Sequence, residues 1–93
     1  MMNRDDAIKK TDYNIADRDE AVERIMQRTM VDVSDAIYEA VEQCEYSCKV
    51  SFSPFDNPVW NAELLKRVAY ELRCESFDVS KNGAGLLIRW TKL

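Results

Sequence analysis

The stretch DRDEAVERIMQRTMVDVSDAIYEAVEQC, residues 17–44, decides the fold. Its apolar residues recur at steps of three and four, which is the spacing of one face of an α-helix. Asp17 stands three residues before Glu20, as in a capping box, so we expect the helix to begin there and to end near Cys44. The apolar stripe consists of Val22, Ile25, Met26, Met30, Val33, Ile37, Ala40, Val41 and Cys44.

A helix of this length spans roughly 40 Å, more than the rest of so small a chain can cover. The stripe therefore predicts self-association into a dimer or larger homo-oligomer, because a two-fold interface needs only one self-complementary patch. We expect four residues at that interface: Val22, Met26, Met30 and Val33. The alternative is a helix that bends at Ser34 and packs wholly on its own domain.

The residues that follow predict one strand, a second helix and a hairpin. Residues 46–53 alternate between apolar and polar side chains, which is typical of a half-buried strand. Asn57 followed by Pro58 favours the start of a helix, which we expect to reach about Arg73. Two further short strands, residues 77–80 and 86–90, are separated by a turn sequence that contains Asn-Gly.

The predicted fold is α+β with the order α-β-α-β-β. We expect the long N-terminal helix and the second helix to pack on one face of a three-stranded mixed sheet, whose first two strands run parallel because a helix joins them. Residues 1–16 are predicted to be a polar N-terminal arm, and residues 17–93 a single domain. The sequence leaves open whether the arm folds back or reaches toward a neighbouring molecule.

The composition argues against an enzyme. The chain has no histidine and no glycine before Gly83, so common acid–base groups and phosphate-binding loops are missing. We therefore expect no catalytic residues, no cofactor and no metal. Cys44, Cys48 and Cys74 are an odd number of cysteines without paired metal-binding spacing, and we expect them to be free thiols in the core. A metal-binding or redox role for them is the alternative.

Charge and hydropathy restrict the partners. Residues 1–45 hold twelve acidic and six basic residues, whereas residues 46–93 hold five acidic and seven basic residues. An acidic chain is a poor ligand for duplex DNA, which attracts clustered lysine and arginine. No apolar run is long enough for a membrane span, and residues 1–6 lack the apolar core of a signal peptide. We expect a soluble cytoplasmic protein.

Acidic residues also line one side of the long helix. Asp32, Asp35, Glu39 and Glu42 follow one another at steps of three and four. Carboxylates so close together repel one another, and near the C-terminus of a helix they oppose its dipole. Two arrangements would compensate them. One is solvation together with pairing within the chain, with Lys49, Lys66, Arg67 or Arg73, and the other is a basic surface on a partner protein.

The C-terminal half suggests a second kind of ligand. Its aromatic and basic residues suit a small anion that carries a base, such as a signalling nucleotide. The candidate ligand-binding residues are Trp60, Tyr70, Arg73, Lys81 and Arg89. The alternative is that the aromatic rings belong to the core and the charged groups are merely solvated.

Several runs resemble the small uncharacterised accessory proteins of tailed bacteriophages. They are IYEAV at residues 37–41 before YSCKV at 46–50, LLKRVAYEL at 64–72 before FDV at 77–79, and IRW at 88–90. The resemblance implies a protein made in the cytoplasm of a bacterial host that inhibits a host or anti-phage defence component by binding or sequestration. It implies no catalytic residues. The alternative function is a structural or assembly module that oligomerises through the long helix.

Overall fold

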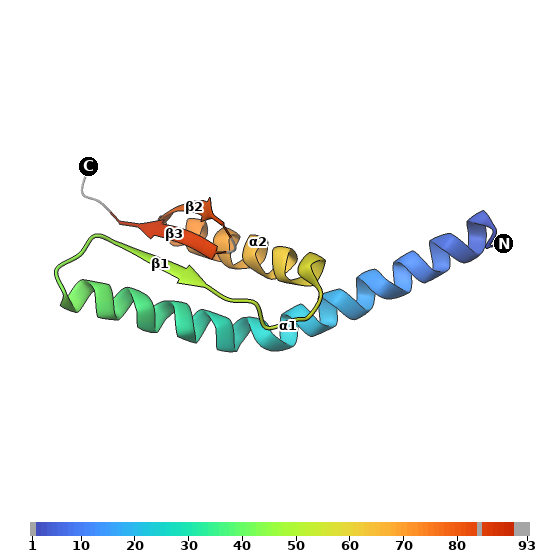
Figure 1. Cartoon of the computed structure of the whole chain (residues 1–93), viewed down its shortest axis with the longest axis horizontal. Helices are drawn as coiled ribbons and strands as arrows, with labels where there is room; N and C mark the ends of the chain where they lie inside the picture. Colours follow the sequence, from blue (N-terminus) through green and yellow to red (C-terminus); the bar gives the residue numbers. More distant parts are fainter. Residues whose placement is uncertain (1, 84, 91–93) are drawn as a thin grey trace.

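The computed structural model describes residues 2–83 and 85–90, which form two helices and three strands (Figure 1). The elements are α1 (Arg4–Glu42), β1 (Ser47–Ser51), α2 (Pro58–Cys74), β2 (Asp78–Asn82) and β3 (Gly85–Arg89). The predicted α+β class and the order α-β-α-β-β are confirmed. Asn57 caps α2 by accepting a hydrogen bond from the Val59 N–H at 2.9 Å, with Pro58 in the first turn as expected.

The sheet is antiparallel, and the prediction of a mixed sheet is wrong. Its strand order is β1-β3-β2, and β3 is antiparallel to both neighbours. β1 and β2 do run in the same direction, but β3 lies between them. The strand sequences explain the order, because β3 carries the apolar run Leu86-Leu87-Ile88, which suits the central position. Charged and polar residues such as Lys49 and Asp78 suit the edge strands.

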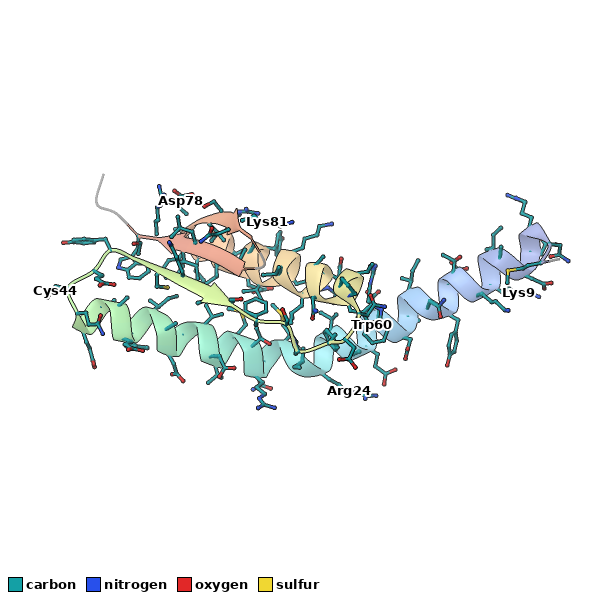
Figure 2. The ribbon with its side chains drawn as sticks, viewed as in Figure 1. Lys9, Arg24, Cys44, Trp60, Asp78 and Lys81 are labelled. Atoms are coloured by element: carbon teal, nitrogen blue, oxygen red, sulfur yellow. The ribbon has the colours of Figure 1, made fainter. Side chains whose placement is uncertain are left out.

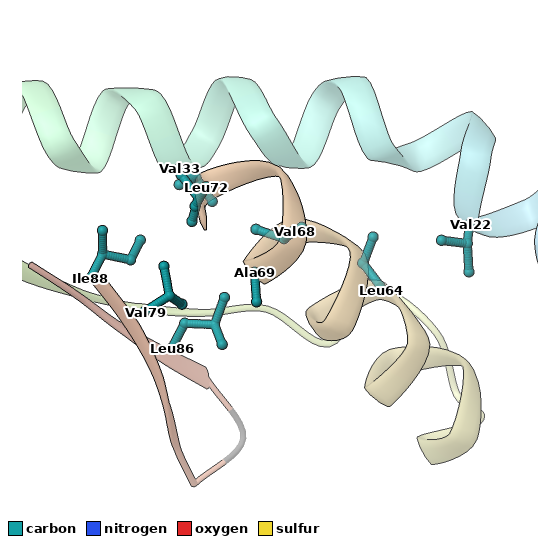
Figure 3. Close-up of a cluster of buried hydrophobic side chains, with 9 residues drawn as sticks. All are labelled: Val22, Val33, Leu64, Val68, Ala69, Leu72, Val79, Leu86 and Ile88. Atoms are coloured by element: carbon teal, nitrogen blue, oxygen red, sulfur yellow. The ribbon is translucent and has the colours of Figure 1, made fainter. Parts of the chain in front are cut away.

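Both helices cover one face of the sheet. The inner face carries Cys48 of β1 opposite Ile88 of β3, which in turn lies opposite Val79 of β2. α1 packs beneath β1, and α2 packs beneath β2 and β3. The core between these two layers, drawn in Figure 3, consists of Val22, Val33, Leu64, Val68, Ala69, Leu72, Val79, Leu86 and Ile88.

The first helix begins much earlier than Asp17, so that predicted boundary is wrong. α1 starts at Arg4, and the Asn3 side chain caps it by accepting a hydrogen bond from the Asp6 N–H at 2.9 Å. Neither glycine nor proline interrupts the chain between Asn3 and Glu42. Residues 4–16, expected as a polar arm, are therefore helical and extend well beyond the two-layer body, so that the molecule is 58 Å long (Figure 1).

Both helices end in the same hydrogen-bonded motif without glycine. Cys44 has a φ of 60°, and its N–H donates to the Val41 carbonyl at 3.0 Å, while the Glu45 N–H donates to the Ala40 carbonyl at 2.9 Å. This pair of bonds is a Schellman motif. The same two bonds close α2, where Ser76 has a φ of 70°. Each of these two non-glycine residues occupies a left-handed conformation that glycine would adopt at lower cost.

The three cysteines are free, but they do not all lie in the core. Cys44 and Cys74 are exposed near the ends of the two helices, whereas Cys48 is half-buried on the inner face of β1. The expectation of core thiols is therefore wrong for Cys44 and Cys74. Burial, and to a lesser extent the negative charge of Glu45, raises the pKa of the Cys48 thiol above its ordinary value of 9.0.

Candidate binding surfaces

The predicted acidic residues lie on one exposed side of α1. Asp32, Asp35, Glu39 and Glu42, which we call the acidic stripe, are all solvent-exposed. Within residues 2–83 and 85–90, none of the four forms an ion pair with a basic side chain. The last turn of α1 also holds no basic residue to offset the helix dipole.

Two of the bases considered as intramolecular partners are engaged elsewhere. Arg67 binds Asp19 at 2.7 Å and Glu63 at 3.1 Å, which joins α2 to α1 near the middle of the long helix. The Arg73 guanidinium donates to the Val79 carbonyl at 3.0 Å. Other acidic residues of the chain thus form ion pairs, while the acidic stripe faces solvent.

Exposed apolar side chains adjoin the acidic stripe, and of these only Val41 belongs to the apolar stripe predicted from the sequence. Val31 is 55% exposed, Tyr38 is 71% exposed and Val41 is 51% exposed. Asp35 is four residues from Val31 and three from Tyr38, so the three side chains are neighbours on the helix surface. We call Val31, Asp35, Tyr38, Val41 and Glu42 the outer ridge of α1. The seven-residue step from Val31 to Tyr38, away from the main stripe, is the sequence signal for it.

A mostly apolar groove of about 320 Å³ runs beside this ridge, between the C-terminal halves of α1 and α2. Tyr38 and Val41 belong to both the ridge and the groove. The residues that line the groove are Met30, Ser34, Ile37, Tyr38, Val41, Leu72, Glu75 and Phe77. The groove contains a single charged side chain, Glu75, so its chemistry suits apolar groups rather than an anion.

A second groove of about 410 Å³ lies nearer the middle of α1 and has a charged rim. Glu23 and Met26 form its α1 side. Its α2 side is formed by Glu63, Lys66, Arg67, Tyr70 and Glu71. Charges of both signs stand around it, and two of them, Arg67 and Glu63, already bind each other.

The five residues predicted to bind a small anion are not gathered in one place. Trp60 packs edge-on against Phe55, with ring centroids 5.4 Å apart, at the start of α2. Tyr70 is 65% exposed over the charged groove, and Lys81 lines a different groove near the β2–β3 turn. Arg89 lies on β3, on the sheet face away from the helices, and Arg73 binds a backbone carbonyl. One chain therefore does not assemble this predicted site.

Two of the four residues predicted for an oligomer interface lie in the core of the chain, and the other two are partly buried. Val22 is 0% exposed and Val33 is 2% exposed, and both belong to the core. Met26 and Met30 are partly buried and pack against that core. Val22 and Val33 cannot form the predicted interface in this conformation, because they are enclosed in the core, whereas Met26 and Met30 remain partly exposed and line the two grooves.

The described part of the chain contains no cluster of three or more cysteine or acidic side chains placed to hold a metal ion. Across the same residues, neither helix combines the length and the apolar character that crossing a bilayer requires. Figure 2 shows that most charged side chains of α1 point outward along its whole length.

The chain matches no protein-family model, no curated protein and no solved structure. Inferences about its function therefore rest on its own surfaces.

Proposed function

We propose that this chain is a non-enzymatic binding protein whose target is another protein, engaged by the outer ridge of α1 and the apolar groove beside it. One observation carries this proposal: Val31, Tyr38 and Val41 are more than half exposed and lie next to carboxylates that have no partner within the described chain. Contiguous exposed apolar groups often mark protein interfaces, and tyrosine is common among the residues that dominate binding energy.

The charge of the ridge indicates the chemistry of the partner. Asp35 and Glu42 flank Tyr38, and Asp32 and Glu39 lie on the same side of the helix. A partner segment with apolar anchors for the groove and lysine or arginine beside them would complement this surface. A second copy of the chain fits poorly there, because a two-fold pairing of this side of α1 would bring together the four carboxylates of both acidic stripes, eight in all. The proposed partner is therefore a different protein with a basic surface.

The setting of this interaction follows from the resemblance to phage accessory proteins. We propose that the chain acts in the cytoplasm of a bacterial host and inhibits a host or anti-phage defence protein by covering a basic surface that the target needs. Sequestration of a small anionic nucleotide has weaker support, because Tyr70, Arg73, Lys81 and Arg89 do not converge in one chain.

The test is an affinity purification from bacterial cytoplasm with the full chain as bait, followed by titration calorimetry with each purified partner. One variant, Tyr38→Ala with Val41→Ser, removes apolar groups of the ridge. A second variant, Asp35→Asn with Glu42→Gln, removes its charges. Two control variants change equally exposed groups elsewhere: Tyr13→Ala with Val59→Ser, and Asp56→Asn with Asp78→Asn.

We expect the apolar variant to weaken binding by a factor of about 30 or more, as for a hot-spot residue. The charge variant should weaken binding and make the dissociation constant less sensitive to salt, because it removes screened attractions. Both control variants should bind like the wild type. A partner that binds all four variants equally well would show that the ridge is not the interface.

A further inference from the structure

The hydrogen-bond pattern of the sheet determines which backbone groups of β1 lie at its free edge. The Trp90 N–H donates to the Tyr46 carbonyl at 3.0 Å, and the register of β1 and β3 places these two residues opposite each other. Bonded and non-bonded pairs alternate along an antiparallel ladder, so Cys48 and Val50 bond to β3. The residues between them direct their N–H and C=O groups away from β3. They are Ser47, Lys49 and Ser51.

These edge groups of β1 have no partner within residues 2–83 and 85–90. The backbone hydrogen bonds outside the helices and strands, and those between side chains and backbone, all involve other residues. An unpaired strand edge is a template for pairing with another extended chain. β1 therefore offers three N–H donors and three C=O acceptors to an incoming strand.

The opposite edge of the sheet, on β2, is better protected. By the same alternation, Val79 and Lys81 direct their backbone groups to that edge. The Val79 carbonyl accepts a hydrogen bond from the Arg73 guanidinium at 3.0 Å. Lys81 shares the helix-covered face with the buried Val79, and a charged side chain on the inner face of an edge strand discourages pairing. Of the two edges, β1 is the one open to a further strand.

A groove of about 260 Å³ lies between the free edge of β1 and α1, which runs alongside the strand (Figure 1). Its lining residues are Thr29, Asp32, Val33 and Ala36 of α1, and Lys49, Val50, Ser51 and Phe52 of β1 and the loop after it. A second groove of about 370 Å³ shares Thr29, Asp32 and Phe52 and continues past the end of β1. A strand added to β1 would therefore have room for the side chains that it directs toward α1.

We propose that this edge binds an extended segment of another protein, which pairs with β1 as a fourth strand of the sheet. Hydrogen bonds to the backbone of Ser47, Lys49 and Ser51 would hold the segment, and its alternating side chains would give specificity. The antiparallel direction is expected, since antiparallel pairs are the more stable per residue.

Two charges beside the edge indicate the side chains of the segment. The segment residue opposite Val50 points to the same face as Val50, into the groove lined by Asp32. Asp32 is exposed and has no ion pair within the described chain, so lysine or arginine suits this position. The next residue lies opposite Lys49 on the outer face, where an acidic side chain suits it. Arg28 lines only the second groove, past the end of β1. The expected segment thus carries a basic residue followed by an acidic one.

A second copy of β1 is a poorer occupant of the edge. Antiparallel pairing of two β1 strands at full overlap sets Lys49 of one chain opposite Lys49 of the other, and like charges opposite each other are destabilising. The two-fold axis would also bring both α1 helices, each with its acidic stripe, to the same junction. A single extended segment meets neither obstacle.

The experiment is a titration of the full chain, followed by NMR, with the end-blocked peptide Thr-Val-Thr-Lys-Glu-Val-Thr. In the proposed register its lysine lies opposite Val50 and its glutamate opposite Lys49. We expect a dissociation constant of about 1 mM or lower. The amides of Ser47, Lys49 and Ser51 should become protected from hydrogen exchange, whereas the Lys81 amide at the other edge should not change.

Two matched peptides test the charges and the backbone register. Exchanging the lysine and the glutamate should weaken binding roughly fivefold or more, and Asp32→Lys with Lys49→Glu should reverse this preference. N-methylation of the glutamate removes an N–H that faces β1, and should weaken binding about tenfold or more. N-methylation of the lysine changes an N–H that faces away from β1, and should leave binding nearly unchanged.

Several results would overturn the proposal. They are an absence of binding at about 5 mM peptide, equal binding of the charge-exchanged peptide, and equal binding of the two N-methylated peptides. Protection of the Lys49 amide that grows with protein concentration in the absence of peptide would identify a second copy as the occupant, and would also overturn it. Tyr38→Ala with Val41→Ser should bind the peptide like the wild type. This inference and the proposed function can therefore fail independently.

Discussion

β3 passes close to the backbone of β1 at Gly85, and replacing this glycine with alanine should disrupt the sheet. A Cβ atom at Gly85 would overlap the carbonyl oxygen of Val50 and lie 3.0 Å from its carbonyl carbon and 3.1 Å from the Ser51 Cα. These are backbone atoms, so they cannot rotate away as a side chain would. Since carbon contacts normally lie near about 3.5 Å, the C-terminal end of β1 must move by roughly 1 Å. The pairing of Ser51 with residue 85 would be lost.

The expected cost of Gly85→Ala comes from two terms. Forcing extra volume into packed structure costs about 1–3 kcal/mol, and losing one or two strand hydrogen bonds costs about 1 kcal/mol each. The free energy of unfolding should therefore fall by about 2–5 kcal/mol, a large share of the total for a domain of this size. In thermal unfolding followed by circular dichroism, we expect the Tm to drop by about 10–30 °C.

Gly83 provides the matched control, because it is a nearby glycine with a different constraint. Its φ is 60°, but a Cβ atom there would meet nothing within 4 Å. Gly83→Ala should therefore cost only the left-handed conformation, about 1 kcal/mol. Hydrogen exchange should show lost protection in β1 for the Gly85 variant and retained protection for the Gly83 variant. Equal losses of stability in the two variants, or normal protection of β1 in both, would refute the reasoning.

Three further predictions concern a helix end and the thiols. Ser76→Gly should raise the free energy of unfolding by about 0.5–1 kcal/mol. Glycine removes the strain of a left-handed φ at the end of α2, and this gain exceeds the entropy that glycine adds to the unfolded chain. Urea unfolding measures the change, and a lower midpoint would contradict the prediction. A maleimide reagent should modify exposed Cys44 and Cys74 before half-buried Cys48. Mass analysis of peptides taken over time measures the three rates. Equal rates would contradict the half-buried position of Cys48. Because the pKa of Cys48 is raised in the folded state, the unfolded chain loses the thiol proton at a lower pH than the folded chain does. The free energy of unfolding should therefore fall as the pH rises above 9.0. Cys48→Ala should remove that part of the pH dependence.

Local patterns predicted most of the secondary structure. The alternation around Lys49 marks β1, and Asn57 with Pro58 marks the start of α2, because both signals act between residues close in the sequence. The start of α1 was less certain from sequence, since both Asn3 and Asp17 stand three residues before an acidic residue and no helix breaker lies between them. The apolar periodicity begins after Asp17, which is why the pattern predicts a start there.

The central position of β3 could not be read from local patterns, because it depends on which strand packs best between two others. The parallel rule for strands joined by a helix predicted the relative direction of β1 and β2, but it did not show that a third strand would separate them.

The candidate surfaces also include some that local patterns predict and others that depend on tertiary packing. The acidic stripe lies on one side of α1 as predicted, because helix geometry alone determines which residues share a side. Val22 and Val33 illustrate the opposite case, since an apolar stripe looks the same in sequence whether α2 or another molecule covers it. Tyr70 and Lys81 also needed the tertiary structure, because they lie on different elements and line different grooves.

The strand order has a consequence for how this protein is made. Every backbone pairing in the sheet involves β3, which is synthesised after both of its neighbours. While a ribosome is still translating residues 52–84, β1 has no strand to pair with, and β2 has none until β3 follows it. α1 and α2 can form by then, but the nascent chain exposes two single strands and the apolar side of both helices. Pairing of the sheet therefore begins only when residues 85–89 have left the ribosome, so a chaperone that shields nascent chains can bind these exposed strands until then.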